Sequence, residues 1–204
     1  MIRRKTTPKV TDGRVAPKNR RARSAVARFD GGVLPGALSP IVQREHPGRT
    51  YRHVVDEWDV RLFVGLLAEW PELSRCLRGI LLAAGDGDCM GWYSRGVIGL
   101  SAWDRDLFQE WDKEFVDEHA LVMERLDVPT EPCDEGTVLC RFDEASARGF
   151  LLMHVLLHEL GHHRDRIETR RRVDSPRGEP FAEAYANERA ATLWPAYHRA
   201  FARR

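Results

Sequence analysis

The stretch FLLMHVLLHELGHHR, residues Phe150 to Arg164, determines how the rest of this 204-residue chain is interpreted. It contains the pattern His-Glu-x-x-His at His158, Glu159 and His162. In an α-helix, residues four apart differ by about 40° around the axis, so the two imidazoles project from one face, one turn apart. Imidazoles placed in this way can bind one metal ion. Glu159 is rotated by about 100° from His158, which leaves its carboxylate beside the ion, where it can accept a proton from water.

The residues around this pattern argue against a chance match. The pattern alone is short and recurs accidentally. Here the seven residues before His158 are apolar except for His154, which predicts a helix buried on most of its surface. Buried polar side chains are costly unless they are bound, so we favour metal ligation over a hydrogen-bonded pair of core histidines. For His154 itself, ordinary burial is favoured over a role as an alternative ligand.

A catalytic zinc site takes three protein ligands, so a third ligand is expected downstream. The metzincin continuation His-x-x-Gly-x-x-His is missing, since the corresponding positions hold Asp165 and Glu168. Asp174 follows three arginines and precedes a Ser-Pro-Arg-Gly turn, which is typical of a solvated loop. A later helix offers Glu183 and Glu188 as the remaining candidates.

The His-Glu-x-x-His of residues 158–162, followed by Glu-x-x-Ala-Asn at residues 183–187, resembles the gluzincin metallopeptidases, the zincin group that includes thermolysin. The resemblance covers about 50 residues. It implies zinc bound by two histidines and by a glutamate on a later helix. It also implies that the residue four positions after this glutamate orients a ligand histidine, a contact that affects metal affinity.

The predicted zinc ligands are therefore His158, His162 and Glu183, with Asn187 four residues after Glu183. Glu188 remains the alternative third ligand, although the residue four positions after it is a threonine.

The predicted function is that of a zinc-dependent metallopeptidase. It would hydrolyse peptide or protein substrates by a zinc-activated water, with Glu159 as the general base. By analogy with zincins, an edge strand beside the active-site helix would pair with an extended peptide. Tyr197 and His198 are weak candidates for oxyanion donors. The alternative is a non-catalytic binding or regulatory protein that keeps a metal-stabilised zincin scaffold and uses its basic N-terminal arm to contact nucleic acid or a partner. A minimal peptidase whose groove is completed by a partner is a third hypothesis.

Charge is distributed unevenly along the chain. Residues 1–28 contain ten lysines or arginines and one acid, which leaves 22 basic and 30 acidic residues afterwards. Residues 1–30 are therefore predicted to be a basic disordered tail. A solvated terminus is the favoured interpretation, with weak contact to nucleic acid or an acidic partner as the other. Because no apolar run suits a signal peptide or a membrane span, a soluble cytoplasmic protein with four reduced cysteines is expected.

The predicted fold class is α+β and zincin-like, with a small, mainly antiparallel sheet packed on the active-site helix and on a C-terminal glutamate helix. Residues 31–50 are predicted to be a Gly/Pro-rich connector, and residues 51–204 the metallopeptidase domain. The expected elements are a helix over 51–70, a strand over 77–84, a hairpin over 91–101, one or two helices over 104–126, a strand over 137–142, the metal helix with Asp143 as its N-cap, and a last helix over 178–201 that Pro195 kinks or ends near Trp194.

Overall fold

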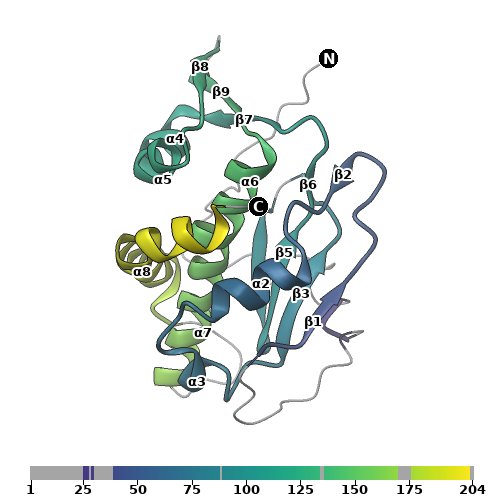
Figure 1. The fold of residues 1–204 in the computed structure, drawn as a ribbon, viewed down its shortest axis with the longest axis vertical. Coiled ribbons are helices and arrows are strands. Elements are labelled where there is room, and N and C mark those ends of the chain that lie inside the picture. The colour runs from purple at the N-terminus through teal and green to yellow at the C-terminus, as the bar shows by residue number, and fades with distance from the viewer. Residues whose placement is uncertain are drawn as a thin grey trace.

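The computed structural model describes residues 25–27, 29, 39–87, 89–133, 136–169 and 176–202. These residues form a mixed α+β protein with several small sheets and helices (Figure 1). Most of the predicted basic tail and the candidate ligand Asp174 lie outside the described residues. Within the described part, none of the helices is long and apolar enough to cross a membrane. All four cysteines are free thiols.

The elements follow one another along the chain in an irregular alternation of strands and helices. They are β1 (Val42–Arg44), β2 (Tyr51–Arg52), α2 (Glu57–Val64), α3 (Trp70–Leu73), β3 (Gly79–Ala83), β4 (Gly91–Ser94), β5 (Val97–Ser101), β6 (Trp103–Asp104), β7 (Phe108–Asp112), α4 (Lys113–Glu118), α5 (Ala120–Arg125), β8 (Thr130–Pro132), β9 (Thr137–Arg141), α6 (Glu144–Phe150), the π-helix η2 (Leu151–Leu156), α7 (Leu157–Thr169) and α8 (Gly178–Phe201).

The main sheet has four strands in the order β1-β3-β5-β4. The pairs β1/β3 and β3/β5 are parallel, and β4 pairs with β5 in the antiparallel direction. The predicted hairpin is confirmed: β4 and β5 are joined by Arg95 and Gly96, which have φ values of 49° and 81°, as in the primed turns that suit hairpins. The prediction of a mainly antiparallel sheet is wrong for this sheet. The chain crosses over through α2 and α3 between β1 and β3, and such a crossover restores the strand direction.

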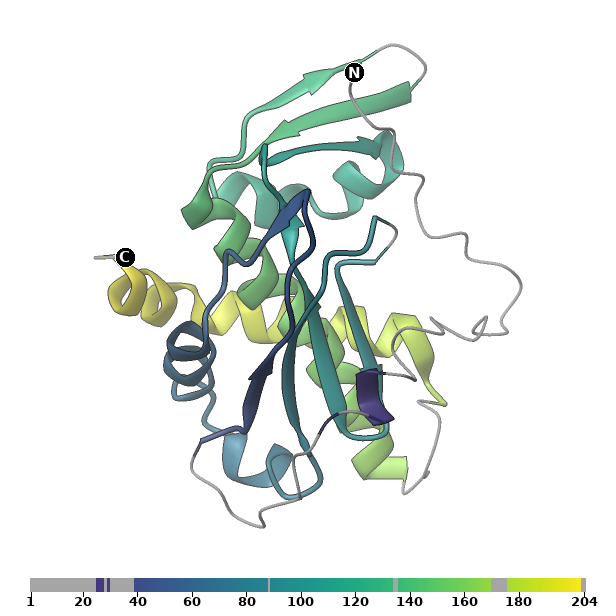
Figure 2. The ribbon, with the colours of Figure 1, turned by 90° about the vertical axis from the view of Figure 1, so that its right-hand side faces the viewer.

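Strand β3 is buried on both faces of the sheet. Ile80 and Leu82 face the core that contains the helices α6 to α7, whereas Leu81 and Ala83 face a second cluster on the other side. That second cluster includes Ala25, Val26 and Phe29. Figure 2 shows the segment 25–27, in purple, in front of the sheet on the side away from α7. The folded core therefore extends upstream of the predicted boundary at residue 51, through β1 and as far as residue 25.

Two predicted helices are partly wrong. The 51–70 segment begins as strand β2, and α2 starts only after Asp56, whose side chain accepts a hydrogen bond from the Asp59 amide in a capping box. In the 104–126 segment, β7 precedes α4 and α5. Along β7, every second side chain is buried, namely Gln109 and Trp111, and the strand pairs with β9. The apolar residues at 108 and 111 also suit a helical spacing, so periodicity alone favoured the wrong element.

The strands predicted over 77–84 and 137–142 are confirmed as β3 and β9. Of the two effects predicted for Pro195, a kink or an end of the last helix near Trp194, the end is wrong, because α8 continues through Pro195 to Phe201. Proline removes one backbone donor, and the buried side chains of Trp194, Tyr197 and Phe201 hold this part of the helix against the core.

One continuous helical rod carries the quoted stretch. It starts at the predicted N-cap Asp143, which forms a capping box with Ser146, and runs through α6, η2 and α7. The main sheet covers one side of this rod, and α8 packs against another (Figures 1 and 2). The histidines of the quoted stretch therefore lie between the sheet and the last helix.

Candidate metal centre

Helix α7 carries His158 and His162 one turn apart, as the sequence predicts. Their ring centroids are 4.9 Å apart and the rings are nearly perpendicular. The side chain of His158 is 17% exposed and that of His162 9%. The apolar residues before them are buried, which confirms that the pattern lies on a mostly buried helix.

Gly161, inside the pattern, lets α8 approach α7 closely. A Cβ atom at this position would lie 2.7 Å from Cα of Ala182 and 3.0 Å from its carbonyl oxygen. Real Cβ atoms do not approach backbone so closely. The absent side chain therefore permits the first turns of α8 to lie against the histidine face of α7.

Glu179, in the first turn of α8, is the carboxylate that meets both histidines. Its Oε2 atom lies 3.0 Å from Nε2 of His158 and 3.4 Å from Nε2 of His162. Ligand atoms of a tetrahedral zinc ion with bonds of about 2.0–2.1 Å are about 3.3 Å apart. The three side chains offer one ligand atom each, all within 4.8 Å of one another. They form a two-histidine, one-carboxylate donor set of the kind that zinc prefers.

Glu183, the predicted third ligand, contacts the other side of His158. Nδ1 of His158 donates a hydrogen bond of 3.1 Å to Oε2 of Glu183, and Asn187 donates one of 3.0 Å to Oε1. Glu179, one helical turn before Glu183, is therefore the carboxylate nearest to both Nε2 atoms. Glu179 faces the two Nε2 atoms, and Glu183 fixes the orientation of the His158 ring. Carboxylates that accept the second N–H of a ligand histidine commonly perform this task in metal sites.

The charges of this group depend on each other. Burial alone would lower the pKa of His158, but the hydrogen bonds with Glu179 and Glu183 outweigh it and raise this pKa to about 10. Burial likewise opposes ionisation of Glu183, yet the hydrogen bond with His158 and the neighbouring histidines lower its pKa to about 2. Without a metal ion, a charged imidazolium therefore lies between two carboxylates.

The alternative ligand Glu188 lies outside this group. Its side chain is 72% exposed and its carboxylate is 3.8 Å from Arg189. Tyr197 and His198, the weak candidates for oxyanion donors, are also far from this group. Tyr197 is buried in the apolar core, and both Tyr197 and His198 lie about 27 Å or more along α8 from Glu179, at 1.5 Å of rise per residue.

A buried carboxylate on α7 fixes the start of α8. Asp165 is 0% exposed and accepts hydrogen bonds of 2.8 Å from both the backbone N–H and Nε of Arg177. Arg177 precedes Gly178, whose φ of 65° is one that glycine adopts more readily than other residues, and Glu179 follows directly. Asp165 therefore fixes the position of the backbone just before Glu179. Sequence reasoning missed this role, because Asp165 stood out only as a departure from the metzincin pattern.

Glu159 is buried, at 5% exposure, on the side of α7 that faces the edge strand β4. A Cβ at Gly91 in β4 would lie 3.3 Å from both Cγ and Oε1 of Glu159, so the strand backbone passes directly over this carboxylate. Substitution of Gly91 by any larger residue would displace Glu159 or Val155. The general-base candidate thus lies between α7 and β4, the edge strand of the main sheet among the described residues.

A second polar network joins β4 to α7. Nε2 of His163 donates to the carbonyl of Leu73 at 2.9 Å, so Nδ1 accepts from the hydroxyl of Tyr93 at 3.1 Å. Arg166 donates to the same hydroxyl at 2.7 Å. Burial lowers the pKa of His163 to about 4, which keeps its ring neutral in this network. The network holds the edge strand in register with the helix that carries Glu159.

Comparison of the chain with protein-family models, with curated proteins and with solved structures finds no match.

Proposed function

We propose that this protein is a zinc-dependent hydrolase of the zincin type that cleaves peptide bonds. The observation that carries the proposal is the convergence of His158 Nε2, His162 Nε2 and Glu179 Oε2, with Glu183 bound to the other nitrogen of His158. Glu179 and Glu183 are four residues apart. They therefore reproduce the ligand and orienting carboxylate of the gluzincin resemblance, one turn earlier than the sequence reasoning placed them.

In this proposal His158, His162 and Glu179 hold the zinc ion. Zinc bound by three protein ligands lowers the pKa of a water molecule towards about 7 and polarises a substrate carbonyl. Glu183 keeps a proton on Nδ1 of His158, so that Nε2 presents its lone pair to the ion. Asn187 holds Glu183 in turn.

Glu159 acts as the general base. Its buried carboxylate accepts the proton of the attacking water and passes it to the leaving amine. Among the described residues, β4 is the edge strand of the main sheet on the side of Glu159. An extended peptide that pairs with β4 would place its backbone along this side of α7, and such strand addition is a common mode of peptide recognition.

The ligand set is tested by zinc content. Purified wild type, Glu179→Gln and Glu183→Gln proteins are loaded with zinc and dialysed, and Glu188→Gln serves as a matched control from the exposed face of α8. We expect Glu179→Gln to retain one zinc ion fewer than wild type and the control, and Glu183→Gln to bind zinc at this centre more weakly. Full zinc content in Glu179→Gln together with loss in Glu183→Gln would restore Glu183 as the ligand.

Catalysis is tested with Glu159→Gln, which keeps the shape of the side chain and removes its basicity. Cleavage of a mixed peptide library is followed by mass spectrometry. The proposal requires cleavage by wild type and a loss of at least about 100-fold in Glu159→Gln, with zinc content unchanged. A wild type that binds zinc but cleaves no peptide would instead favour the non-catalytic, metal-stabilised scaffold.

A further inference from the structure

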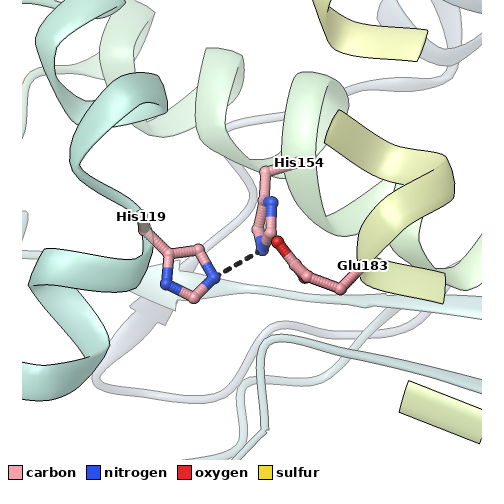
Figure 3. A group of neighbouring side chains, drawn as sticks. All are labelled: His119, His154 and Glu183. Carbon is pink, nitrogen blue, oxygen red and sulfur yellow. Dashed lines mark hydrogen bonds between the residues drawn. The ribbon is translucent and has the colours of Figure 1, made fainter. Parts of the chain in front are cut away.

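A second group of side chains that could hold a metal ion consists of His119, His154 and Glu183 (Figure 3). His119 comes from the junction of α4 and α5, and His154 from the π-helix η2. Their Nε2 atoms are 2.9 Å apart, and the two side chains are 7% and 8% exposed. One ligand atom from each histidine and one from Glu183 lie within 4.8 Å of one another.

We propose that His119, His154 and Glu183 form a second site for a divalent cation of the zinc class. Two imidazoles and one carboxylate are a donor set suited to zinc and similar transition-metal ions. The short separation of the two Nε2 atoms is near the spacing of two ligands on one small ion. The existence of this site is independent of the proposed hydrolase function, and only its coupling to the first site rests on that proposal.

The surroundings of His119 prepare its ring for ligation. Its Nδ1 donates a hydrogen bond of 2.7 Å to the carbonyl of Phe115, because a carbonyl can only accept. In the neutral ring, Nε2 then carries a lone pair that points towards His154. The ring also stacks on Phe115 at a centroid distance of 4.0 Å, which restricts its rotation. Metal-bound histidines characteristically donate their other N–H to a backbone carbonyl in this way.

The π-helix explains why His154 belongs to this group rather than to the first. A π-helical segment has a wider turn than an α-helix, which changes the direction of side chains before it relative to those after it, and such segments are frequent at functional sites. His154 lies within η2, whereas His158 lies in α7. Their ring centroids are 6.1 Å apart. His154 therefore meets His119, whereas His158 meets Glu179.

Glu183 can serve both groups because a carboxylate has about four lone pairs. One oxygen accepts from His158 and the other from Asn187, which leaves lone pairs for an ion beside His119 and His154. A cation there would withdraw negative charge from the carboxylate that orients His158. We therefore expect the two sites to influence each other, so that occupancy of the second site weakens zinc binding at the first.

The test is a count of bound zinc by native mass spectrometry on the full chain. Wild type is compared with His119→Gln, His154→Gln and His162→Gln. His53→Gln is the control, since His53 is part-buried and bonded to the carbonyl of Glu45, outside both groups. Circular dichroism verifies that each variant is folded. We expect two ions in wild type and in the control, one in each of the three other variants, and zero in the double variant His119→Gln/His162→Gln.

A wild type that saturates at one ion, retained by His119→Gln and lost by His162→Gln, would overturn the second site and leave the two histidines as a hydrogen-bonded pair. One ion that is lost by His119→Gln but retained by His162→Gln would support the second site and remove the first, together with the proposed function. Imidazole ¹⁵N NMR of wild type during zinc titration tests the second site without substitutions. The Nε2 resonances of His119 and His154 must shift as the second site fills, and unchanged resonances at two equivalents would refute it.

Discussion

Gly161→Ala tests whether close packing of α7 and α8 forms the proposed metal centre. The added Cβ would lie 2.7 Å from Cα of Ala182, and ordinary van der Waals contact begins at 3.4 Å. Because the nearest atoms belong to the backbone of α8, no side-chain rotation can relieve the clash. Helix α8 must therefore move away from α7 by about 0.7 Å, the difference between the two distances.

The expected loss of stability is small, whereas the expected loss of zinc affinity is large. Overpacking costs about 1–3 kcal/mol, and alanine regains about 1 kcal/mol over glycine within a helix, so about 0–2 kcal/mol is lost. Metal sites tolerate ligand displacements of only about 0.2 Å. A shift of Glu179 by several tenths of an ångström should thus weaken zinc binding about tenfold or more.

Zinc affinity is measured by competition with a chelator, and unfolding free energy by urea titration. Gly87→Ala is the control, because a Cβ there would meet only the Tyr51 hydroxyl at 3.8 Å. Unchanged zinc affinity in Gly161→Ala, with a stability equal to wild type, would refute the claim that this glycine sets the spacing of the ligand helix.

Three further predictions concern residues that hold the helices and the edge strand around the site in place. Asp165→Asn removes the buried charge that holds the start of α8, so zinc affinity should fall about 10-fold to 100-fold while the protein remains folded by circular dichroism; an unchanged affinity would contradict the anchoring role. Tyr93→Phe removes the hydroxyl that donates to His163 and accepts from Arg166, and urea titration should show a loss of about 1–3 kcal/mol; an equal or higher stability would show that this network is not needed. Asp143→Ala should cost about 1 kcal/mol at neutral pH and Asp143→Asn much less. The hydrogen bonds from the backbone and side chain of Ser146 lower the pKa of Asp143 in the folded protein. Its contribution is therefore present above the unfolded pKa of about 3.9 and lost as the pH falls through the folded value, so the deficit of the alanine variant should shrink below about pH 4; a deficit that is constant with pH would argue against a charged cap.

The local part of the candidate metal centre was predictable from sequence. The spacing of His158 and His162 places them on one helical face whatever the rest of the fold is, and the apolar lead-in predicts burial of that helix. The cap at Asp143 and the hairpin that contains β4 are equally local, since each depends on residues within a few positions. None of these features requires knowledge of how distant segments pack.

The identity of the carboxylate that meets both Nε2 atoms, Glu179, was not predictable in the same way. Glu179 with Glu183 and Glu183 with Asn187 both have the four-residue spacing, so spacing alone could not choose between them. The choice depends on where α8 begins relative to α7. That position is set by Asp165, which binds Arg177, and by the contact at Gly161.

His119 was not predictable either, because its position also depends on how distant segments pack. It lies 35 residues before His154, in a segment whose apolar spacing predicted one or two helices and no strand. A single helix over 104–126 would be about 35 Å long and would hold His119 on its surface in one fixed direction.

In the structure, β7 pairs with β9, and the short helices α4 and α5 follow it with His119 between them. Because β9 leads directly through Asp143 into α6 and η2, the pairing of β7 with β9 brings the α4–α5 junction against the π-helix. The group of His119 and His154 thus depends on the pairing of β7 with β9, which the apolar periodicity of the sequence did not predict. Breaking that pairing should separate His119 from His154 while leaving His158 and His162 together on α7.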